Sequence, residues 1–407
     1  MKILFITLGT DMHVRERGIY NDLLRTFSKK EHDLFVVSPL ERRHKQKTNL
    51  YKYQRIIHLR VWSTNIQKTN WAEKGFTTVV LEYLLLFAIV KYMKQVKFDL
   101  IIYSTPPITL NNMVKYFKKR DTAATYLLLK DLFPQNAIDL KLIRKESMLH
   151  RFFKKTEKSL YLISDYIGCM SPKNVDYLLE NNHEIAPSKV EVNPNSIIPI
   201  GADFSNENIA LIRHEYSIPR DAILFLYGGN LGLPQGIDFM IKILSTIVKI
   251  PNVYFVLIGS GTEYAKLESW FKLIEPHNAK LIPSLPKADF DKLLKAADIG
   301  LVSLHSNFTI PNFPSRILSY MEMAIPVLLV TDLSTDIGSI SESNGFGLWS
   351  EAGDLKSFTG NVKKLISSKD LRIRMGLKAR KYLLENYTTM NSYNIIMKHF
   401  SERKYLE

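Results

Sequence analysis

Short apolar runs alternate with amphipathic segments through the first half of the chain. Continuous apolar runs are typical of strands buried on both faces, and apolar residues spaced by three and four are typical of helices. The pattern predicts strands at residues 2–7, 33–38, 55–62, 99–104, 124–129 and 165–170. It predicts helices near residues 17–30, 75–94, 109–120 and 150–163, and another with Ser171 as N-cap and Pro172 at its first position. Such alternation indicates a parallel sheet covered by helices on both faces.

The alternation starts again in the second half, after an aperiodic stretch at residues 193–204. We expect strands near 223–228, 253–259, 280–282, 299–304 and 326–331. We expect helices near 236–249, 262–271, 288–297, 315–323, 354–367, 370–386 and 390–400. A chain of 407 residues is too long for one ordinary core. The sequence therefore predicts two doubly wound α/β domains, at 1–195 and 206–387. Residues 196–205 would link them, and a C-terminal helix within 388–407 would pack outside the second domain or cross back to the first.

Residues 223–236, ILFLYGGNLGLPQG, join an apolar strand to a helix through a turn rich in glycine. Glycine lets backbone N–H groups approach an anion closely, and the N-terminus of the following helix offers partial positive charge. The turn is therefore typical of a site for a phosphate-bearing ligand. The alternative, left open by the sequence, is a turn that needs glycine only for a positive φ angle.

Composition indicates a globular protein from a reducing compartment. Hydrophobic residues make up 46% of the chain, and the single cysteine, Cys169, allows neither a disulfide framework nor a cysteine-based metal site. The apolar run after Met1 is short and lacks a cleavage pattern, so we expect a first buried strand rather than a signal peptide. The apolar stretch at 76–90 contains Glu82 and is shorter than the roughly 20 residues of a spanning helix. We expect it to be buried or interfacial.

Positive charge is concentrated in the first half. Residues 1–200 hold 32 Lys and Arg against 19 Asp and Glu, whereas the remainder holds 23 against 21. This bias favours an anionic membrane surface or a pyrophosphate-bearing acceptor as partner. Solvated helix faces would give the same composition. We do not expect nucleic acid, because no recognition motif accompanies the charge.

Several motifs together resemble one family. YGGNLGLPQGIDF, VLIGSGTEYAKL, ADIGLVSL and NFPSRILSYMEMAIPVL look like the donor-binding half of the retaining family-4 glycosyltransferases of GT-B fold. In the first half, KDLFPQNAIDL and SLYLISDYIGCMSPKNVDYL resemble segments of the bacterial surface-polysaccharide (O-antigen and capsule) branch, and VNPNSIIPIG resembles its interdomain segment. The resemblance covers nearly the whole chain. It implies two Rossmann-like domains facing across a cleft, with a nucleotide-sugar donor in the second domain and an acceptor in the first.

The resemblance also implies donor-site residues. Backbone at the glycine turn would meet the diphosphate, and Arg316 would add a charge-assisted hydrogen bond; as a plain surface arginine it would have no such role. The candidate donor-binding residues are Gly228, Gly229, Asn230, Gly232, Gln235, Gly259, Gly261, Ile282, Ser284, Asn312, Phe313, Ser315 and Glu322. The turns at Gly259 and Ile282 would also suit ordinary strand-to-helix connections.

The chain departs from the family pattern at four positions. Asn230 and Gln235 stand where many relatives place Arg and Lys, and Pro311 and Ser319 stand where relatives carry two glutamates. Glu322 and Asn312 are the candidates to substitute for those glutamates. Otherwise donor recognition is altered.

Candidate acceptor-side residues follow strands of the first half. Lys130 and Asp131 end one strand; Asp131 would bind a sugar hydroxyl or act as a base, and Lys130 would offset phosphate charge. Asp131 would equally serve as a structural cap of the next turn. The other candidates, all after strand ends, are Thr10, His13, Arg15, Arg17, Ser104 and Thr105.

We therefore expect a retaining, metal-independent hexosyl- or N-acetylhexosaminyltransferase without cofactor, with Lys130, Asp131 and Arg316 as catalytic candidates. It would move a sugar from a nucleotide-diphospho-sugar, for which the resemblance favours UDP, to a polyprenyl-diphosphate-linked saccharide at the cytoplasmic face of the inner membrane. Two alternatives stay open. One is a nucleotide-sugar-binding pseudoenzyme that supports a partner transferase, and the other is a sugar-nucleotide epimerase of the same fold.

Overall fold

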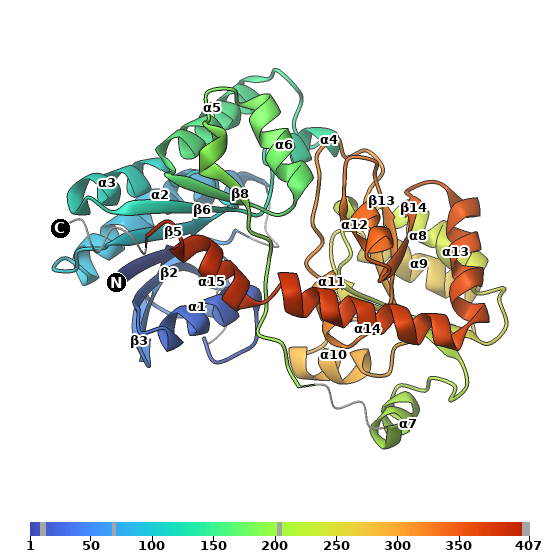
Figure 1. Ribbon diagram of the computed structural model, residues 1–407. Coiled ribbons are helices and arrows are strands. Elements are labelled where there is room, and N and C mark those ends of the chain that lie inside the picture. The colour runs from blue at the N-terminus through green and yellow to red at the C-terminus, as the bar shows by residue number, and fades with distance from the viewer. Residues whose placement is uncertain (9–13, 67–70, 202–205, 401–407) are drawn as a thin grey trace. The chain divides into compact units, whose positions relative to one another are not determined.

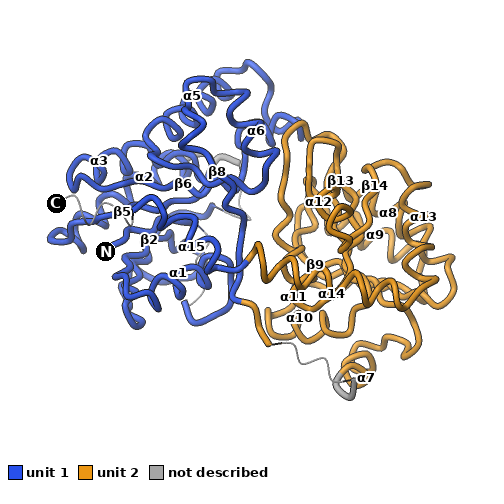
Figure 2. The backbone as a smooth tube through the Cα atoms, viewed as in Figure 1, with its two compact units in different colours: residues 1–198, 388–407 blue, residues 199–387 orange. Residues whose placement is uncertain are grey.

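The computed structural model describes residues 1–8, 14–66, 71–201 and 206–400 (Figure 1). The chain forms two compact units, which Figure 2 shows in different colours: unit 1 is residues 1–198 with 388–407, and unit 2 is residues 199–387. Each unit has its own central sheet with helices on its faces. The predicted class, α/β with two doubly wound units, is confirmed.

Unit 1 is built on an eight-stranded sheet with the order β3-β4-β2-β1-β5-β6-β7-β8. Its strands are β1 (Lys2–Ile6), β2 (Asp33–Glu41), β3 (Asn49–Tyr53), β4 (Ile56–Ser63), β5 (Leu100–Ser104), β6 (Ala124–Leu129), β7 (Tyr166–Cys169) and β8 (Val190–Val192). Every residue of β5 and of β6 is buried, which explains their unbroken apolar runs. Neighbouring strands run parallel except β3 and β4, which pair antiparallel. The expectation of a wholly parallel sheet is therefore wrong at this edge, where β3 alternates half-buried and exposed residues.

Helices cover both faces of the unit 1 sheet (Figure 1). On one face Phe27 and Ile396 join Phe5 in the core, so α1 and α15 pack there. On the other face Tyr103 bonds Ser164, which follows α5, at 2.7 Å. The helices are α1 (Ile19–Lys29), α2 (Trp71–Tyr92), α3 (Asn111–Asp121), α4 (Gln135–Asp139), α5 (Met148–Ile163), α6 (Pro172–Asn181) and α15 (Thr389–Met397), with 3-10 turns η1 (Arg42–His44) and η2 (Pro187–Lys189).

The last helix of the chain, α15, belongs to unit 1 rather than to the unit that precedes it in sequence. Its first residue, Thr389, bonds Thr26 of α1 side chain to side chain at 2.7 Å. Ser392 Oγ donates to Asn193 Oδ1 at 2.7 Å. Two buried polar contacts and an apolar face thus hold α15 on unit 1.

Unit 2 is built on a six-stranded parallel sheet with the order β11-β10-β9-β12-β13-β14. Its strands are β9 (Ile223–Asn230), β10 (Val253–Ser260), β11 (Ala279–Ile282), β12 (Ile299–Ser303), β13 (Val327–Thr331) and β14 (Gly347–Glu351). Its helices are α7 (Asn206–Glu215), η3 (Leu233–Gln235), α8 (Ile237–Ile247), α9 (Tyr264–Ile274), α10 (Lys287–Leu294), α11 (Ile317–Glu322), α12 (Ile337–Ser343), α13 (Leu355–Ser367) and α14 (Lys369–Asn386).

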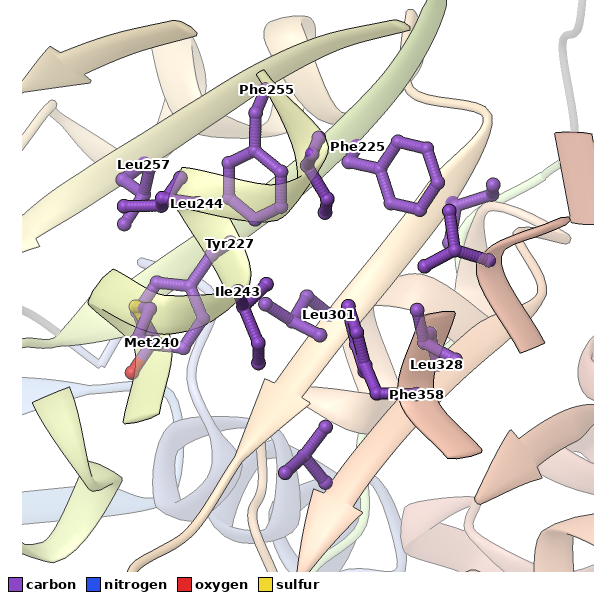
Figure 3. Packing of buried hydrophobic residues seen from close by; sticks show 14 of the residues in the cluster. Phe225, Tyr227, Met240, Ile243, Leu244, Phe255, Leu257, Leu301, Leu328 and Phe358 are labelled. Atoms are coloured by element: carbon purple, nitrogen blue, oxygen red, sulfur yellow. The ribbon is translucent and has the colours of Figure 1, made fainter. Parts of the chain in front are cut away.

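The core of unit 2 lies between one face of this sheet and the helices α8 and α13 (Figure 3). Phe225 and Tyr227 point into it from β9, Met240 from α8 and Phe358 from α13, and all four side chains are fully buried. Because side chains alternate along a strand, Gly228 faces the opposite side of the sheet. The core thus holds β9 in place up to Tyr227, just before the glycine-rich turn.

Each predicted strand is present. The sequence analysis missed several short elements, and it also missed α12, with seven residues, and α7, with ten. β3, β8 and β14 have three to five residues, as do α4 and η3. Ser171 is the N-cap of α6, as predicted, and its hydroxyl accepts from Asn174 N–H at 3.4 Å. The chain passes from unit 1 to unit 2 at Ile198–Pro199.

Candidate functional site

The strand order of unit 2 places the glycine-rich turn at the reversal point of its sheet. β9 and β12 are neighbours, with β10 and β11 to one side and β13 and β14 to the other. In sheets of this order, ligands bind beyond the carboxyl ends of the strands at the reversal point. β9 ends at Asn230, and the turn that follows leads into α8. The turn therefore lies where this architecture is suited to hold a ligand.

Two positions of this turn require glycine for conformational reasons. Gly229 has φ 132° and Gly236 has φ 63°, both in the region that side chains disfavour. A Cβ atom on Gly236 would also lie 3.2 Å from the carbonyl oxygen of Leu304, just beyond the end of β12. The turn is thus shaped by positive φ angles, as one of the two readings of the sequence expected.

Asn230 and Gln235 close the turn from within. Gln235 Oε1 accepts from Asn230 Nδ2 at 2.9 Å and from Gly232 N–H at 3.2 Å. The backbone amide of Gly232, expected to face an anion, is therefore already bonded to a side chain. Asn230 and Gln235, the two neutral residues at positions where the resemblance leads one to expect Arg and Lys, are thus bonded to each other.

Arg316 supplies positive charge beside this turn. Its guanidinium carbon lies 4.4 Å from the centre of the Tyr227 ring, and a Cβ atom on Gly229 would lie 3.4 Å from the same carbon. Arg316 Nη1 is buried and has no hydrogen-bond partner among the described residues. A buried donor left unpaired costs about 1–3 kcal/mol. An anion seated at Gly229 would give Nη1 the acceptor that it lacks.

Arg316 and Ser315 form the turn that precedes α11. The sequence analysis expected both residues inside the helix. The helix begins two residues later, at Ile317, with Arg316 as its N-cap. The N–H groups of Ile317 and Leu318 are bonded to the carbonyl oxygens of Pro314 and Ser315, so the candidate anion contact at this place is the Arg316 side chain.

Packing accounts for three other candidate glycines. A Cβ atom on Gly228 would meet the Phe290 ring at 2.2 Å, one on Gly259 would meet the carbonyl oxygen of Gly229 at 1.8 Å, and one on Gly261 would meet that of Leu231 at 2.3 Å. Gly259 and Gly261 let the end of β10 lie against the turn after β9. Their effect on a ligand would be indirect, through the shape of that turn.

The remaining donor-side candidates lie after other strands of unit 2. Ile282 is the half-buried last residue of β11, and Ser284 is exposed beyond it. Asn312 N–H donates to Thr335 Oγ1 at 3.1 Å, and the Phe313 ring stands edge-on to Tyr387 at 5.4 Å. Asn312 therefore sits beside the loop that follows β13.

Glu322 has a structural partner. Its Oε1 accepts from the backbone N–H of Ile200 at 2.9 Å, and Arg380 Nη2 donates to the carbonyl oxygen of Ile200 at 2.7 Å. Arg380 Nη1 also donates to the backbone carbonyl of Glu322. This buried cluster fixes the first residues of unit 2, and the Glu322 carboxylate is engaged in it.

In unit 1, Lys130 and Asp131 follow β6. The backbone N–H groups of Lys130 and Asp131 donate to Thr105 Oγ1 at 3.0 and 3.3 Å. Lys130 Nζ donates to the carbonyl oxygen of Asn193 at 2.9 Å, and Asn136 Nδ2 donates to Asp131 Oδ1 at 2.7 Å. Both side chains are half-buried and held in place, a geometry compatible with either the structural or the catalytic role.

Burial shifts the pKa values of both side chains toward 7. It raises the pKa of the Asp131 carboxyl to about 6, against the hydrogen bonds from Asn136 and the Leu132 N–H, which favour the carboxylate. It lowers the pKa of the Lys130 ammonium to about 7. Such pKa values suit groups that exchange protons near neutrality.

The other acceptor-side candidates are only partly within the described residues. Thr10 and His13 lie outside them. Arg15 is exposed over the Tyr53 ring at 5.0 Å, and Arg17 Nη2 donates to the carbonyl oxygen of Ile198 at 3.4 Å.

The hydroxyls after β5 are buried. Ser104 Oγ donates to Thr7 Oγ1 at 3.1 Å, and Thr105 Oγ1 accepts from the backbone N–H groups of Lys130 and Asp131. Both residues are 1% exposed, so they support the loop rather than present a surface.

Two positioning residues escaped the sequence analysis. Tyr320 is fully buried; its hydroxyl donates to the carbonyl oxygen of Leu226 at 3.1 Å and accepts from Gly228 N–H at 3.3 Å. Asn193 joins Lys130 to Ser392 of α15. Tyrosines and asparagines of this kind are recognisable only from their tertiary partners. Across the described ranges, no group of three or more His, Cys, Asp and Glu side chains is placed to hold a metal ion.

Unit 2 contains the segment that a family model matches. Residues 208–382 match the model of the glycosyl transferases group 1. This group 1 domain includes the glycine turn, Arg316 and Glu322.

Curated relatives match over part of their length. The chain is 25% identical to "Probable glycosyltransferase WbjE" of Pseudomonas aeruginosa over 237 residues, 54% of each chain. It is 20% identical to "Putative colanic acid biosynthesis glycosyl transferase WcaI" of Escherichia coli K12 over 163 residues, 40% of each chain. The matches thus span about half of these relatives or less.

Among solved structures, that of Anabaena HepE in complex with UDP aligns with a TM-score of 0.69. The alignment covers 99% of this chain and all of that one at 14% identity. This likeness covers unit 1 and unit 2, and it shows that the chain has the fold of the GT-B glycosyltransferases.

Proposed function

We propose that this protein is a glycosyltransferase that moves a sugar from a nucleotide-diphospho-sugar to a lipid-linked saccharide. The observation that carries the proposal is the Arg316 guanidinium, with a buried and unpartnered Nη1, beside Gly229 at the reversal point of the group 1 domain. A diphosphate is the group that such a cation and turn suit best. The name of WcaI supports surface polysaccharide as the pathway, and the UDP bound by HepE supports uridine as the base.

The proposed chemistry places the developing negative charge on the departing diphosphate. Arg316 Nη1 would donate to a phosphate oxygen more strongly as that charge grows, which lowers the barrier selectively. The proposal needs no metal ion, since the unpaired guanidinium supplies positive charge itself. We further propose front-face attack with retention of the anomeric configuration. The family resemblance alone supports that detail.

On the acceptor side, we propose that Asp131 receives the proton of the attacking hydroxyl. A carboxyl whose pKa lies near 6 is mostly ionised at pH 7 and is still basic enough to take a proton. We propose that Lys130 lies beside the acceptor's phosphates. Because its pKa is lowered to about 7, Lys130 would carry its positive charge below pH 7 and lose it above. A polyprenyl-diphosphate-linked saccharide at the cytoplasmic membrane face is the acceptor that this pair and the basic first half suit.

Two measurements on the full chain test the proposal. Thermal unfolding against a panel of nucleotide sugars should show one ligand class that raises the midpoint, because a ligand at 100 times its Kd stabilises by about 2.7 kcal/mol. Labelled sugar from that donor should then appear in a detergent-dispersed lipid-linked acceptor. If no nucleotide sugar shifts the midpoint, or sugar is released only to water, the proposal fails.

A specific observation favours a second candidate, a nucleotide-sugar-binding pseudoenzyme. The family's two glutamates are replaced by Pro311 and Ser319, and the Glu322 carboxylate is engaged with Ile200. Midpoint shifts with nucleotide sugars, together with no turnover on any lipid-linked acceptor, would favour this candidate over the transferase.

A further inference from the structure

Exposed apolar side chains gather where α5 begins. Met148 is 90% exposed, Leu142 67%, Leu149 51% and Phe152 49%. Large apolar side chains exposed together in one short segment are uncommon on a protein that meets only water, and they mark interaction surfaces. Met148, Leu149 and Phe152 share the first turns of one helix, and Leu142 lies in the loop before it. We call residues 141–155 the basic-apolar segment.

This segment is also strongly basic. It holds six Lys and Arg against one Glu, a net charge of +5 within 15 residues. Lys154 is paired with Glu157, whereas Arg144, Lys145 and Arg151 form no ion pair with another described residue. Unpaired cations around exposed apolar side chains complement an anionic membrane surface, where each Lys or Arg near the headgroups adds attraction.

The stretch at 76–90, which the sequence analysis considered for a membrane contact, also exposes apolar side chains, namely Val79, Tyr83 and Phe87, but it lacks the positive charge of the basic-apolar segment. Its other side is buried. Leu81, Leu85 and Ile89 of α2 are buried at 1% exposure or less. Glu82 accepts from Met113 N–H at 2.8 Å, so its carboxylate holds the start of α3. The whole of α2 carries two lysines and two glutamates, and so no net charge. In the described part of the chain, no helix combines the length and apolar character needed to cross a membrane.

The basic-apolar segment is attached to the loop that carries Asp131. The Phe133 ring stands edge-on to Phe153 of α5 with ring centres 4.8 Å apart. Leu142 N–H donates to the carbonyl oxygen of Ala137 at 2.8 Å, which ties the segment to α4. Asn136, next to Ala137, is the residue that holds the Asp131 carboxylate. A surface that met the segment would therefore lie on the part of unit 1 that also carries the candidate acceptor residues.

We propose that residues 141–155 dock unit 1 onto a bilayer containing anionic lipids. Met148, Leu149 and Phe152 enter the headgroup region, and Arg144, Lys145 and Arg151 bind the anionic headgroups. This inference rests on the proposed function insofar as the acceptor is lipid-linked. It adds which face of unit 1 meets the lipid.

Vesicle sedimentation of the full chain tests the charge component. The protein should bind vesicles of phosphatidylcholine mixed with phosphatidylglycerol more tightly than vesicles of phosphatidylcholine alone. Replacing Arg144, Lys145 and Arg151 together by Gln should weaken binding to the anionic vesicles on the order of 100-fold, at roughly fivefold for each charge. The matched control replaces Lys356, Lys363 and Lys364, exposed on α13 of unit 2, by Gln. It removes the same charge and should leave binding unchanged.

A labelled thiol tests the apolar component. Cys169 is fully buried, so Met148→Cys introduces a single accessible thiol for an environment-sensitive dye. The dye should shift to the blue with anionic vesicles. The matched Phe87→Cys variant, on the exposed side of α2, should show no shift.

Two outcomes overturn the inference: equal vesicle binding by the triple Gln variant and the wild type, or a larger dye shift at position 87 than at 148. Absence of vesicle binding by the wild type also overturns it. None of these assays includes a donor, and the transfer assay uses a dispersed acceptor, so a failed docking surface and a failed transferase assignment give different results.

Discussion

Arg316→Ala should separate function from stability. The guanidinium lies over the Tyr227 ring at 4.4 Å, a contact that contributes about 0.5–2 kcal/mol, and its buried Nη1 lacks a partner. Removing the side chain loses the ring contact but also removes an unpaired donor that costs about 1–3 kcal/mol. The two effects offset each other. We expect the free energy of unfolding to change by less than about 1 kcal/mol, a midpoint shift of roughly 2–4 °C for a unit of this size.

The effect on transfer should be much larger. If Nη1 donates to the diphosphate, Arg316→Ala removes a hydrogen bond to a charged group, which contributes about 1.5–3 kcal/mol. That corresponds to a loss of roughly 10- to 150-fold in kcat/KM. The assay is release of nucleoside diphosphate and labelled lipid-linked product at donor concentrations below KM, with Arg316→Lys as the variant that keeps the charge but loses the planar fork.

Arg213→Ala is the matched control, because Arg213 is a structural arginine of the same unit. Its Nη1 donates to the carbonyl oxygens of Arg220 and Ala222 at 2.8 and 2.7 Å, and its Nη2 donates to Asp298 at 2.7 Å. Removing one partner of a buried ion pair costs about 3–5 kcal/mol; here Asp298 is 30% exposed, but removing Arg213 also leaves buried carbonyl groups without a donor. Arg213→Ala should therefore lower stability strongly. The reasoning is refuted if Arg316→Ala destabilises the protein as much as Arg213→Ala does, or if it leaves kcat/KM within twofold of the wild type.

Three further variants test the structure around the two candidate sites. Gly259→Ala would place a Cβ atom 1.8 Å from the Gly229 carbonyl oxygen, and because backbone cannot yield cheaply we expect a loss of about 1–3 kcal/mol or more in urea unfolding; an unchanged midpoint would contradict the close approach. Glu322→Ala should lower the free energy of unfolding by about 1.5–3 kcal/mol, because Ile200 N–H loses its acceptor. Glu322→Gln keeps an acceptor oxygen and should retain most of the wild-type stability. Abolished transfer in a stable Glu322→Gln variant would instead place this residue at the sugar. Lys130→Met should remove a pH dependence of stability: a pKa lowered to about 7 in the folded state, against about 10.4 unfolded, makes wild-type stability rise with pH above 7. The free energy of unfolding of the wild type minus that of Lys130→Met should therefore increase from pH 7 to pH 9. A value independent of pH would refute the lowered pKa.

Periodicity was sufficient to predict the fold because the parallel strands are buried on both faces. The apolar run of β6, Ala124–Leu129, has the bounds that the sequence predicts. Only part of β3 is covered, and its Leu50 is 45% exposed, so no unbroken apolar run marks it. α4 has five residues and makes little more than one helical turn. Length and two-sided burial account for most of the difference between the elements that were predicted and those that were missed, but not for α7, which has ten residues and was missed.

The glycine-rich turn after β9 could be predicted from the sequence, but the contacts of each of its residues could not. Gly228, Gly229 and Gly259 look equivalent in sequence, yet only Gly229 has a positive φ angle, while Gly228 accommodates Phe290 and Gly259 accommodates a backbone carbonyl. Those neighbours come from residues that are distant along the chain. Asp131 was open between capping and catalysis, and its hydrogen bond from Asn136 with a pKa near 6 still fits both. Sequence patterns locate a turn, whereas tertiary contacts decide what each residue in it does.

Asn230 and Gln235, the neutral residues of the glycine turn, leave Arg316 as the candidate source of positive charge beside it. These two residues, at positions where the family resemblance leads one to expect cations, bond to each other, so both amide side chains already have a partner within the turn. Arg213 also leaves its Nε unpaired, but its two Nη atoms reach four acceptors, and the unmet donor is a small part of a satisfied group. At Arg316 the buried Nη1 lies beside a turn whose residues 228–236 include no Lys or Arg. The contact with the Tyr227 ring offsets the cost of this unpaired donor, so stability alone gives little reason to prefer an arginine at this position. The proposed anionic ligand would give Nη1 its acceptor, and it would be a physical reason for an arginine here.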